Sequence, residues 1–277
     1  MWIIVGDFPI KPVVFIHVPR TGGSTLWHYL ARNLSGHLDV LDLHYEAQRL
    51  SGHEQNALSV LLLYRDKLSK RRTLIHHHGV APINAVLKDA EYVTILRDPV
   101  ERLISYYFHV KRVEAAGYRT NEIPCADISI CEFYDRTPWY ALSYGAWFGA
   151  MMRVGAGICP AEASLNTTCP SGILLQTIEA DPVAFAHSVA DYMRHHILCA
   201  NFSNIQSEAE RVADWIHPEL EPRPLDIYLN KSPDSNFITN AERAWLSAYA
   251  KVDSLLYAQL GLSEDRQQSS EARSAVS

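Results

Sequence analysis

Two glycines flanked by cationic and hydroxyl side chains follow the first apolar run of the sequence. The segment, HVPRTGGST at residues 17–25, leads directly into an amphipathic stretch. Glycines between a strand and a helix let backbone N–H groups approach an anion closely, and the helix N-terminus adds partial positive charge. The alternative is a tight turn without a ligand; a Walker A loop is excluded because GxxxxGK followed by Ser or Thr is absent. The residues that could bind a phosphate group here are Arg20, Thr21, Gly22, Gly23, Ser24 and Thr25.

Arginine and serine lie eight residues apart after a second apolar run. Arg97 directly follows residues 92–96, and Ser105 lies in the segment RDPVERLISYY that begins at this arginine. Ligands of open parallel sheets bind at the carboxyl ends of the strands. A guanidinium that binds two oxygens and a hydroxyl about two helical turns away suit a phosphate group. The alternative is a local ion pair between Arg97 and Asp98 that caps the helix.

The segment LIHHHGV places three histidines at the end of a short apolar run. Imidazole titrates near neutral pH and can take a proton from a reacting hydroxyl. On a strand, His76 and His78 share one face and His77 points the other way. We interpret His78 as a general base and His76 as the second candidate. The alternatives are a solvated strand end and a chance metal site, but adjacent histidines diverge too far to share one zinc ion, and we predict no metal.

Other polar residues have ordinary interpretations. We expect His17 to be a packed or hydrogen-bonded core residue, and His109 to be structural or to lie at the edge of the substrate site. Glu101 and Arg102 fit a solvated helix face, although Arg102 could steer an anion. Residues that could contact an acidic acceptor are Lys111, Arg112 and Arg119, and the run Lys70, Arg71 and Arg72, which we interpret as a solvated turn.

Strands that end where the polar segments begin must position these groups. Apolar runs predict buried strands at residues 13–17, 72–76, 92–96 and 197–200. Patterns with helical spacing predict helices at 25–33, 54–70, 99–115, 138–152, 181–194, 203–216 and 240–260, with turn-rich sequence at 117–137. Alternating strands and helices favour one α/β domain with a parallel sheet over residues 1–262, followed by a polar, disordered tail at 263–277.

The composition excludes several classes of protein. Of 277 residues, 48% are hydrophobic and 20% are charged, as in a globular chain and unlike a disordered, collagen-like or disulfide-stapled one. The formal net charge is −6, so the chain has no overall electrostatic reason to bind nucleic acid or an acidic membrane.

The sequence also favours a cytoplasmic location. No stretch reaches the roughly 18–20 apolar residues that span a bilayer, and the N-terminus lacks the features of a signal peptide. Five cysteines without CxxC spacing argue against a zinc cluster and suit free thiols. The alternative is an excised lumenal catalytic domain, because Cys159 and Cys169 could pair in an oxidising compartment.

Together the two phosphate-binding segments resemble the sulfotransferases that use 3′-phosphoadenosine-5′-phosphosulfate (PAPS). FIHVPRTGGSTL is similar to the 5′-phosphosulfate loop of this family, and TILRDPVERLISYY is similar to its 3′-phosphate motif. The likeness points to the carbohydrate branch, the heparan sulfate 2-O- and 6-O-sulfotransferase type and its bacterial relatives. Weaker similarity extends to Asn230, Lys231 and Ser232 and to the segment DSLLY at 253–257.

The resemblance implies a three-layer, P-loop-like α/β fold with a central parallel sheet flanked by helices. It assigns the 3′-phosphate to Arg97 and Ser105. Many relatives carry Lys where this chain has Arg20, and Arg can stabilise a leaving phosphate but is a very poor acid. The resemblance also assigns the 5′-phosphosulfate to a set of turn residues, namely Arg20, Thr21, Gly22, Gly23, Ser24 and Thr25.

The expected function is transfer of a sulfuryl group from PAPS to an acceptor hydroxyl, on a carbohydrate, by in-line displacement with a histidine base and no metal. A sulfotransferase for tyrosyl or small-molecule hydroxyls, a P-loop-like nucleotide kinase or hydrolase, and a non-catalytic binding module are the alternatives. The aromatic residues of 117–170 are interpreted as core side chains rather than as platforms for sugars.

Overall fold

A computed structural model of the chain describes most of the sequence. The residues that it describes are 10–51, 60–61, 63–68, 70–78, 82–118, 127–137, 143–157, 172–226 and 237–263. Several segments interpreted above lie outside them, namely Arg119, Cys159, Cys169, residues 138–142, residues 230–232 and the tail from residue 264. Cys131 and Cys199, which lie inside, carry free thiols.

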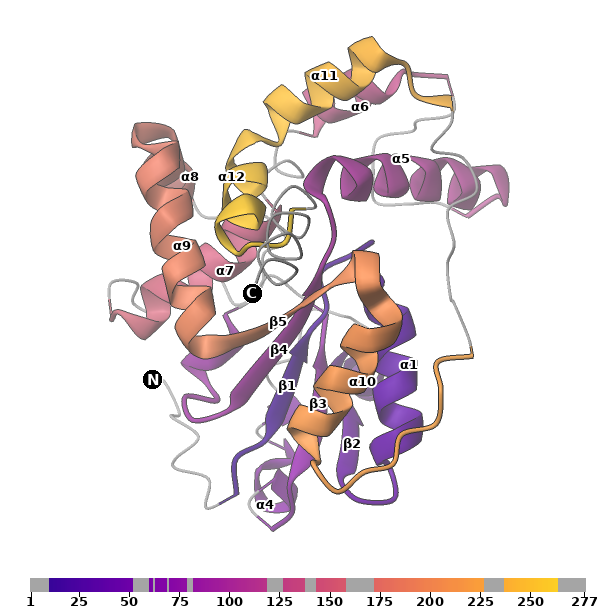
Figure 1. Cartoon of the computed structure of the whole chain (residues 1–277), viewed down its shortest axis with the longest axis vertical. Coiled ribbons are helices and arrows are strands. Elements are labelled where there is room, and N and C mark those ends of the chain that lie inside the picture. The colour runs from indigo at the N-terminus through magenta and orange to yellow at the C-terminus, as the bar shows by residue number, and fades with distance from the viewer. Residues whose placement is uncertain are drawn as a thin grey trace, which may run out of the picture.

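A five-stranded parallel sheet forms the centre of the molecule (Figure 1). Its order is β2-β3-β1-β4-β5, and every neighbouring pair is parallel. The predicted α/β class with a central parallel sheet is therefore confirmed. The strands are β1 (Val13–Ile16), β2 (Asp39–Asp42), β3 (Thr73–His77), β4 (Glu91–Leu96) and β5 (Ile197–Asn201).

Helices cover both faces of the sheet, and side chains alternate between them along each strand. In β1, Val13 and Phe15 face α1 (Gly23–Leu34) and α10 (Ile205–Ile216). The alternate residues Val14 and Ile16 belong to the core that the other helices cover. Because both faces of the sheet are covered, successive residues of a strand such as β1 are all buried, and such strands appear in the sequence as continuous apolar runs. The helices of the second face are α7 (Ser143–Gly155), α8 (Gly172–Ala180), α9 (Pro182–His196) and α12 (Lys251–Gln259).

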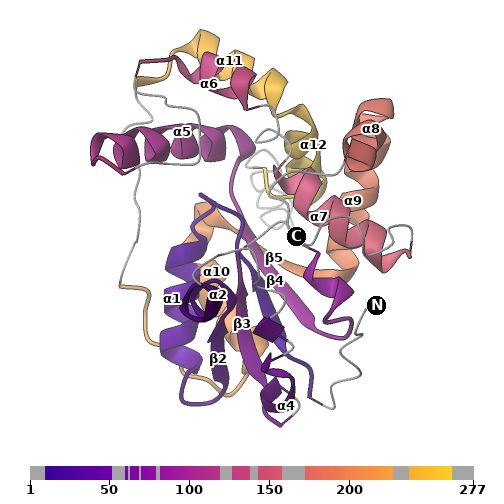
Figure 2. The ribbon, with the colours of Figure 1, turned by 180° about the vertical axis from the view of Figure 1, so that it is seen from behind.

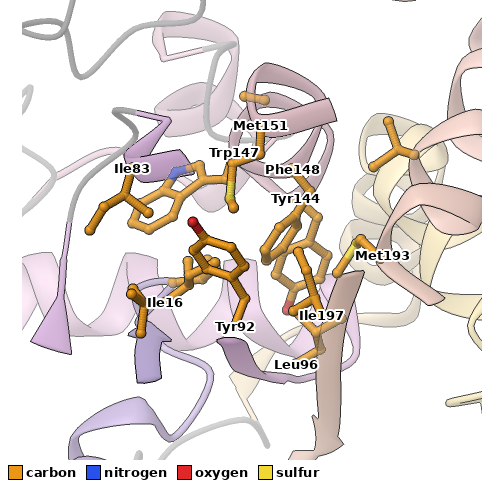
Figure 3. Packing of buried hydrophobic residues seen from close by; sticks show 14 of the residues in the cluster. Ile16, Ile83, Tyr92, Leu96, Tyr144, Trp147, Phe148, Met151, Met193 and Ile197 are labelled. Atoms are coloured by element: carbon orange, nitrogen blue, oxygen red, sulfur yellow. The ribbon is translucent and has the colours of Figure 1, made fainter. Parts of the chain in front are cut away.

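Large aromatic side chains fill the core on this second face (Figure 3). Tyr92 points from β4 toward Trp147 of α7, and Tyr144 and Phe148 lie between this helix and the sheet. Burial confirms the interpretation as core side chains for Phe133, Tyr134, Tyr144, Trp147 and Phe148, whereas Tyr118 is 71% exposed and departs from it.

A third group of helices lies beyond the carboxyl ends of the strands (Figures 1 and 2). It consists of α5 (Pro99–Ala115), α6 (Ile130–Arg136) and α11 (Asn240–Tyr249), which share their own buried cluster. The bounds of α5 agree with the prediction, because Asp98 caps its first turn and Pro99 starts it. Shorter elements are α2 (Leu43–Ser51), α4 (Arg65–Leu68), η2 (Ile83–Ala85) and η4 (Phe202–Asn204).

Asp253 ties this third group to the core. Its carboxylate is fully buried and accepts hydrogen bonds from the backbone N–H groups of Tyr144 and Gly145, each at 2.9 Å. These amides belong to the first turn of α7, where a helix leaves N–H groups without internal partners. Arg102 lies 4.0 Å from the same carboxylate and is itself buried. The similarity noted at 253–257 therefore falls on a structural contact.

Some predicted elements differ from the structure. The strand β2 was not predicted, since aspartates stand at both ends of its short DVLD sequence. The helix expected at 240–260 is two helices, because the backbone turns at Ala250. The helix α8 was also missed, and the helix predicted at 54–70 is described only in part, around α4. None of the described helices is both long and apolar enough to cross a membrane.

Candidate active site

The turn after β1 is held close to two aromatic rings. Gly22, the N-cap of α1, has a φ of 88°, and Arg20 also lies in the left-handed region with a φ of 69°. A Cβ on Gly22 would lie 2.3 Å from the side chain of Phe202. A Cβ on Gly23 would lie 2.0 Å from the ring of His17. Both positions therefore require glycine, and the backbone of the turn passes directly against these rings.

The first turn of α1 has no side-chain cap and no acidic residue among the described residues. Its N-cap residue, Gly22, has no side chain that could accept a hydrogen bond from the backbone amides of this turn, and the acidic residues of the described chain lie elsewhere. The hydroxyl of Thr21 is buried and donates to the carbonyl of Val18 at 2.8 Å, so it holds the turn together. Thr25 is also buried, whereas Ser24 is half-buried. Backbone N–H groups at a helix N-terminus attract an anion.

The second predicted motif begins where β4 ends. The backbone N–H of Arg97 donates to the hydroxyl of Tyr144 at 3.1 Å, which links the strand end to α7. Its guanidinium lies over the ring of Phe202, with Cζ 5.0 Å from the centroid, and 3.7 Å from the Glu101 carboxylate. Phe202 therefore contacts the arginine and also lies beside Gly22, so one ring supports both predicted phosphate-binding segments.

The two segments meet at one edge of the sheet. Nε of Arg20 donates a hydrogen bond to Oγ of Ser105 at 3.2 Å, across 85 positions of sequence. Burial lowers the pKa of Arg20 to about 10, and the charges of Arg112 and Arg97 add to this effect. Burial also lowers the pKa of Arg97. We call Arg20, Arg97 and Arg112 the arginine cluster.

The arginine cluster fits an anionic group such as phosphate or phosphosulfate. Nη1 of Arg112 is buried and has no hydrogen-bond partner among the described residues. Burial and the charges of Arg20 and Arg112 lower the pKa of His109, which lies beside the same cluster. Like charges held together away from water are unfavourable until an anion neutralises them. The residues present therefore suit a ligand with several negative charges.

Histidines occupy the neighbouring part of the same edge, on the side of β3 and β2. Nδ1 of His76 lies 2.8 Å from Oδ2 of Asp42, and Nε2 of His76 lies 2.9 Å from Nδ1 of His17. We call these three residues the histidine chain. Trp27 stacks on His76 with ring centroids 4.5 Å apart. His17 is thus hydrogen-bonded and buried, as predicted.

His78 differs from His17, His76 and His77 because it is exposed and they are buried. Its ring stands edge-on to His17, with centroids 4.8 Å apart, and also approaches Trp147 at 6.5 Å. Desolvation by the surrounding protein atoms lowers the pKa of His78 to about 4, and the charges of His76, His44 and His77 contribute. The imidazole is consequently neutral at pH 7 and holds a lone pair that can accept a proton.

Comparison with known protein families agrees with this geometry. Residues 8–144 match the model of the sulfotransferase family. The chain is a sulfotransferase. The matched region includes the turn after β1, the histidines of the candidate site and the whole of α5.

A solved structure similar to this sulfotransferase is a sulfotransferase from Alicyclobacillus acidocaldarius. The two are 17% identical, the alignment covers 92% of this chain and 98% of that chain, and the TM-score is 0.46. No curated protein sequence matches the chain.

The structure corrects one prediction about the sulfotransferase. Arg102 does not lie on a solvated helix face, because only 1% of its side chain is exposed. It packs over the ring of Tyr144, with Cζ 5.4 Å from the centroid, and beside Asp253. An amphipathic pattern does not distinguish a charged residue that faces solvent from one that is paired inside the core.

The run at residues 70–72 lies at the opposite edge of the sheet, before β3 begins. Arg71 pairs with Asp39 at 3.1 Å, and Arg72 pairs with Glu91 and donates to the carbonyl of Ile216 at 2.8 Å. The guanidinium groups of Arg71 and Arg72 therefore bind residues at the beginning of strands and at the end of α10, away from the arginine cluster.

Sequence reasoning missed two parts of the site. Asp42 went unnoticed because β2 was not predicted, although an aspartate at the carboxyl end of a short strand is a signal that could have found it. Arg112 was assigned only to a possible acceptor contact, yet it lies close enough to Arg20 to lower the pKa of that residue. Among the described residues, no group of three or more His, Cys, Asp or Glu side chains could hold a metal ion.

Proposed function

We propose that this sulfotransferase moves a sulfuryl group from PAPS to a hydroxyl of a carbohydrate acceptor. The observation that carries the proposal is the contact between Arg20 and Ser105, with Arg97 close by. It brings the segment assigned to the 5′-phosphosulfate and the segment assigned to the 3′-phosphate to one edge of the sheet. A donor with phosphate on both sides of its ribose needs two such anion-binding segments.

The chain's own residues divide the binding task. Arg97 and Ser105 bind the 3′-phosphate through charge-assisted hydrogen bonds, which are stronger than neutral ones. Arg20 and the amides of residues 22–25 bind the 5′-phosphosulfate and neutralise the charge that develops on the leaving phosphate. With a pKa of about 10, Arg20 keeps its proton at neutral pH and acts through charge. PAPS supplies the activated sulfuryl group.

His78 is the proposed base, because the acceptor hydroxyl must lose its proton as its oxygen bonds to sulfur and the bond from sulfur to phosphate breaks. An exposed, neutral imidazole beside the turn suits this role. His76 is less suitable, since both of its ring nitrogens are engaged by Asp42 and His17. The proposed mechanism uses no metal.

The proposed acceptor class depends on the resemblance to the carbohydrate branch. The buried rings of Phe133, Tyr134, Tyr144 and Phe148 are not platforms for sugar stacking. Tyr118, at the end of α5, is 71% exposed and is the described aromatic side chain of the 117–157 region most open to an acceptor. A tyrosyl or small-molecule hydroxyl is the alternative acceptor.

Calorimetric titration with 3′,5′-adenosine diphosphate, beside ATP, tests the donor class without any knowledge of the acceptor. We expect the 3′,5′-diphosphate to bind and ATP to bind much more weakly. Arg97→Ala should reduce the affinity about 30- to 100-fold, which corresponds to roughly 2–3 kcal/mol for hydrogen bonds to a charged group. Arg71→Ala, at the opposite edge of the sheet, is the matched control and should bind as the wild type does.

Two results would contradict the proposal. Equal binding of ATP, with a magnesium requirement, would favour a nucleotide kinase or hydrolase. Binding of the diphosphate without sulfate transfer from PAPS to any member of a glycan and phenol panel would favour a non-catalytic binding module.

A further inference from the structure

Asp42, His76 and His17 form a continuous hydrogen-bonded chain across three neighbouring strands. In the sheet register Asp42 pairs with His76, and His76 pairs with Phe15, two residues before His17. The two contacts measure 2.8 Å and 2.9 Å. Because alternate residues of a strand share a face, these side chains lie on the side of the sheet that α1 covers.

Aromatic rings keep the imidazoles of the histidine chain from turning. Trp27 of α1 stacks on His76 at an interplanar angle of 12°. Phe15 lies nearly parallel to both imidazoles, with centroids 5.7 Å from His76 and 5.8 Å from His17. Both imidazoles are buried, with 7% of each residue exposed. Neighbouring rings packed this closely restrict the orientation of an imidazole.

The carboxylate determines which ring nitrogens carry protons. Burial raises the pKa of Asp42, whereas the hydrogen bond and charge of His76 lower it. The lowering is the larger effect in total, so the pKa of Asp42 lies below its usual value. An ionised carboxylate only accepts hydrogen bonds, so Nδ1 of His76 must be protonated. With a single proton, on Nδ1, the ring of His76 offers Nε2 as an acceptor, and Nδ1 of His17 then donates to it. Nε2 of His17 is left with a lone pair, and it lies beside Gly23.

The chain ends against the proposed base. His17 is the ring nearest to His78 in the described structure, at 4.8 Å between centroids. If His17 carried a charge, it would oppose a second charge on His78. Burial lowers the pKa of His17 well below its usual value, and the charges of His78, His76, Arg20 and His44 act in the same direction. The titratable groups that influence His78 are His76 and His77 on β3, His44 on α2, His17 after β1 and Asp42 on β2.

We propose that Asp42 and His76 are positioning residues for the transfer reaction: they hold His17 as its neutral Nδ1–H tautomer, so that His78 takes the acceptor proton beside an uncharged ring and near one carboxylate. This inference rests on the proposed function, in which His78 is the base. The role resembles that of a buried carboxylate that holds a catalytic histidine in one tautomer. Here the carboxylate acts through two rings and stabilises the charge that forms on a third.

Histidine tautomers test the chain without any turnover. Long-range ¹H–¹⁵N correlation spectra of the full chain, labelled at histidine nitrogens, should show Nδ1 protonated and Nε2 unprotonated in both His17 and His76 at pH 7.5. Asp42→Ala should introduce the Nε2–H form of His76, because its Nδ1 proton loses its acceptor. An Nε2–H form of His17 in the wild-type protein would overturn the proposal.

Kinetics test whether the chain acts on the base. With PAPS and whichever acceptor the panel identifies, Asp42→Asn should lower kcat about 10- to 100-fold with little change in the KM for PAPS. Loss of the negative charge lowers the basicity of His78, so the acidic limb of the pH profile of kcat should move to lower pH. Asp42→Glu, which restores the charge, should recover part of the rate.

Asp39→Asn is the matched control, because Asp39 lies at the other end of β2 and pairs with Arg71 and Lys67. A merely structural Asp42 would lower stability but leave the acidic limb in place, and that outcome would overturn the proposal. Absence of PAPS turnover in the wild-type protein would instead refute the proposed function, while the tautomers would still report on the chain.

Discussion

The arginine cluster and the histidine chain occupy neighbouring parts of one sheet edge, yet burial acts on them in opposite ways. The arginine cluster holds permanent cations that repel one another, and one buried nitrogen of Arg112 has no hydrogen-bond partner in the described structure. The histidine chain contains one carboxylate with a lowered pKa and two imidazole rings, and its hydrogen bonds run without a break from Asp42 to His17.

This difference follows from what each group can do when water is removed. A guanidinium cannot lose its proton near neutral pH, so a buried cluster of them stores an unfavourable charge that an anionic ligand relieves. An imidazole can lose its proton, so burial keeps it neutral and leaves a lone pair. One region is thereby suited to bind a charged donor and the other to accept a proton. Gly23 and His17 lie where the two regions touch.

The largest expected effect separates proton transfer from donor binding. His78→Ala should reduce turnover about 10²- to 10⁴-fold, the usual contribution of a general base, without changing the affinity for 3′,5′-adenosine diphosphate. Single-turnover kinetics and calorimetry measure the two quantities. His28→Ala, an exposed histidine on α1, should change neither. If His78→Ala weakened nucleotide binding while turnover at saturation persisted, the two regions would not divide the work as we infer.

A second change tests the contact between the two regions. Gly23→Ala should reduce the affinity for the diphosphate about tenfold or more and lower Tm, because the new Cβ would overlap the ring of His17, and overpacking costs roughly 1–3 kcal/mol. Adding His17→Ala should recover part of the lost Tm by removing the obstacle. Gly36→Ala, where a Cβ would meet open space, is the control and should have little effect. Equal Tm values for Gly23→Ala and Gly36→Ala would show that the ring does not restrict the turn.

Removing one buried cation should separate stability from function in the arginine cluster. Arg112→Leu should bind the diphosphate about 3- to 10-fold more weakly, since one charged partner is lost. The ligand-free variant should have a higher Tm, because the repulsion and the unpartnered nitrogen are gone. Calorimetry and thermal denaturation measure both effects. A lower Tm with unchanged affinity would place Arg112 in the structural framework.

The smallest expected effect concerns pH. Both His17 and His78 have a lowered pKa in the folded protein, about 4 for His78, against about 6.5 in an unfolded chain. Between these values the unfolded chain binds more protons than the folded one, so the free energy of unfolding falls as pH drops from about 6.5 to about 4. Denaturant titrations at pH 7.5 and pH 5 measure this loss. His78→Asn should reduce it and His28→Asn should not; equal losses in both variants would exclude His78 as a contributor.

Much of the fold could be predicted from the sequence, because parallel strands are buried on both faces and appear as apolar runs. The strands β1, β3, β4 and β5 were found in this way, and Asp98 with Pro99 marked the start of α5. The exception, β2, is a four-residue strand with an aspartate at each end. Those aspartates serve the tertiary structure: one pairs with Arg71 at the amino-terminal edge and the other with His76 at the carboxyl edge.

The candidate site divides in the same manner. Residues that shape the turn through local backbone geometry, such as Gly22 and Gly23, could be predicted from their position between a strand and a helix. The functions of Arg102 and Asp42 could not, because each depends on a partner far away in the sequence, Asp253 for one and His76 for the other.

By itself, the sequence determined the α/β class, the glycine turn and the spacing of Arg97 and Ser105, since these depend on interactions between residues close together in the chain. Only the tertiary structure decided that Arg20 and Ser105 touch, that Arg112 joins them, and that Asp42 reaches His17 through His76. The physical reason is that charge repulsion, desolvation and hydrogen bonding act over a few ångströms in space, and the order of parallel strands determines which distant residues come that close.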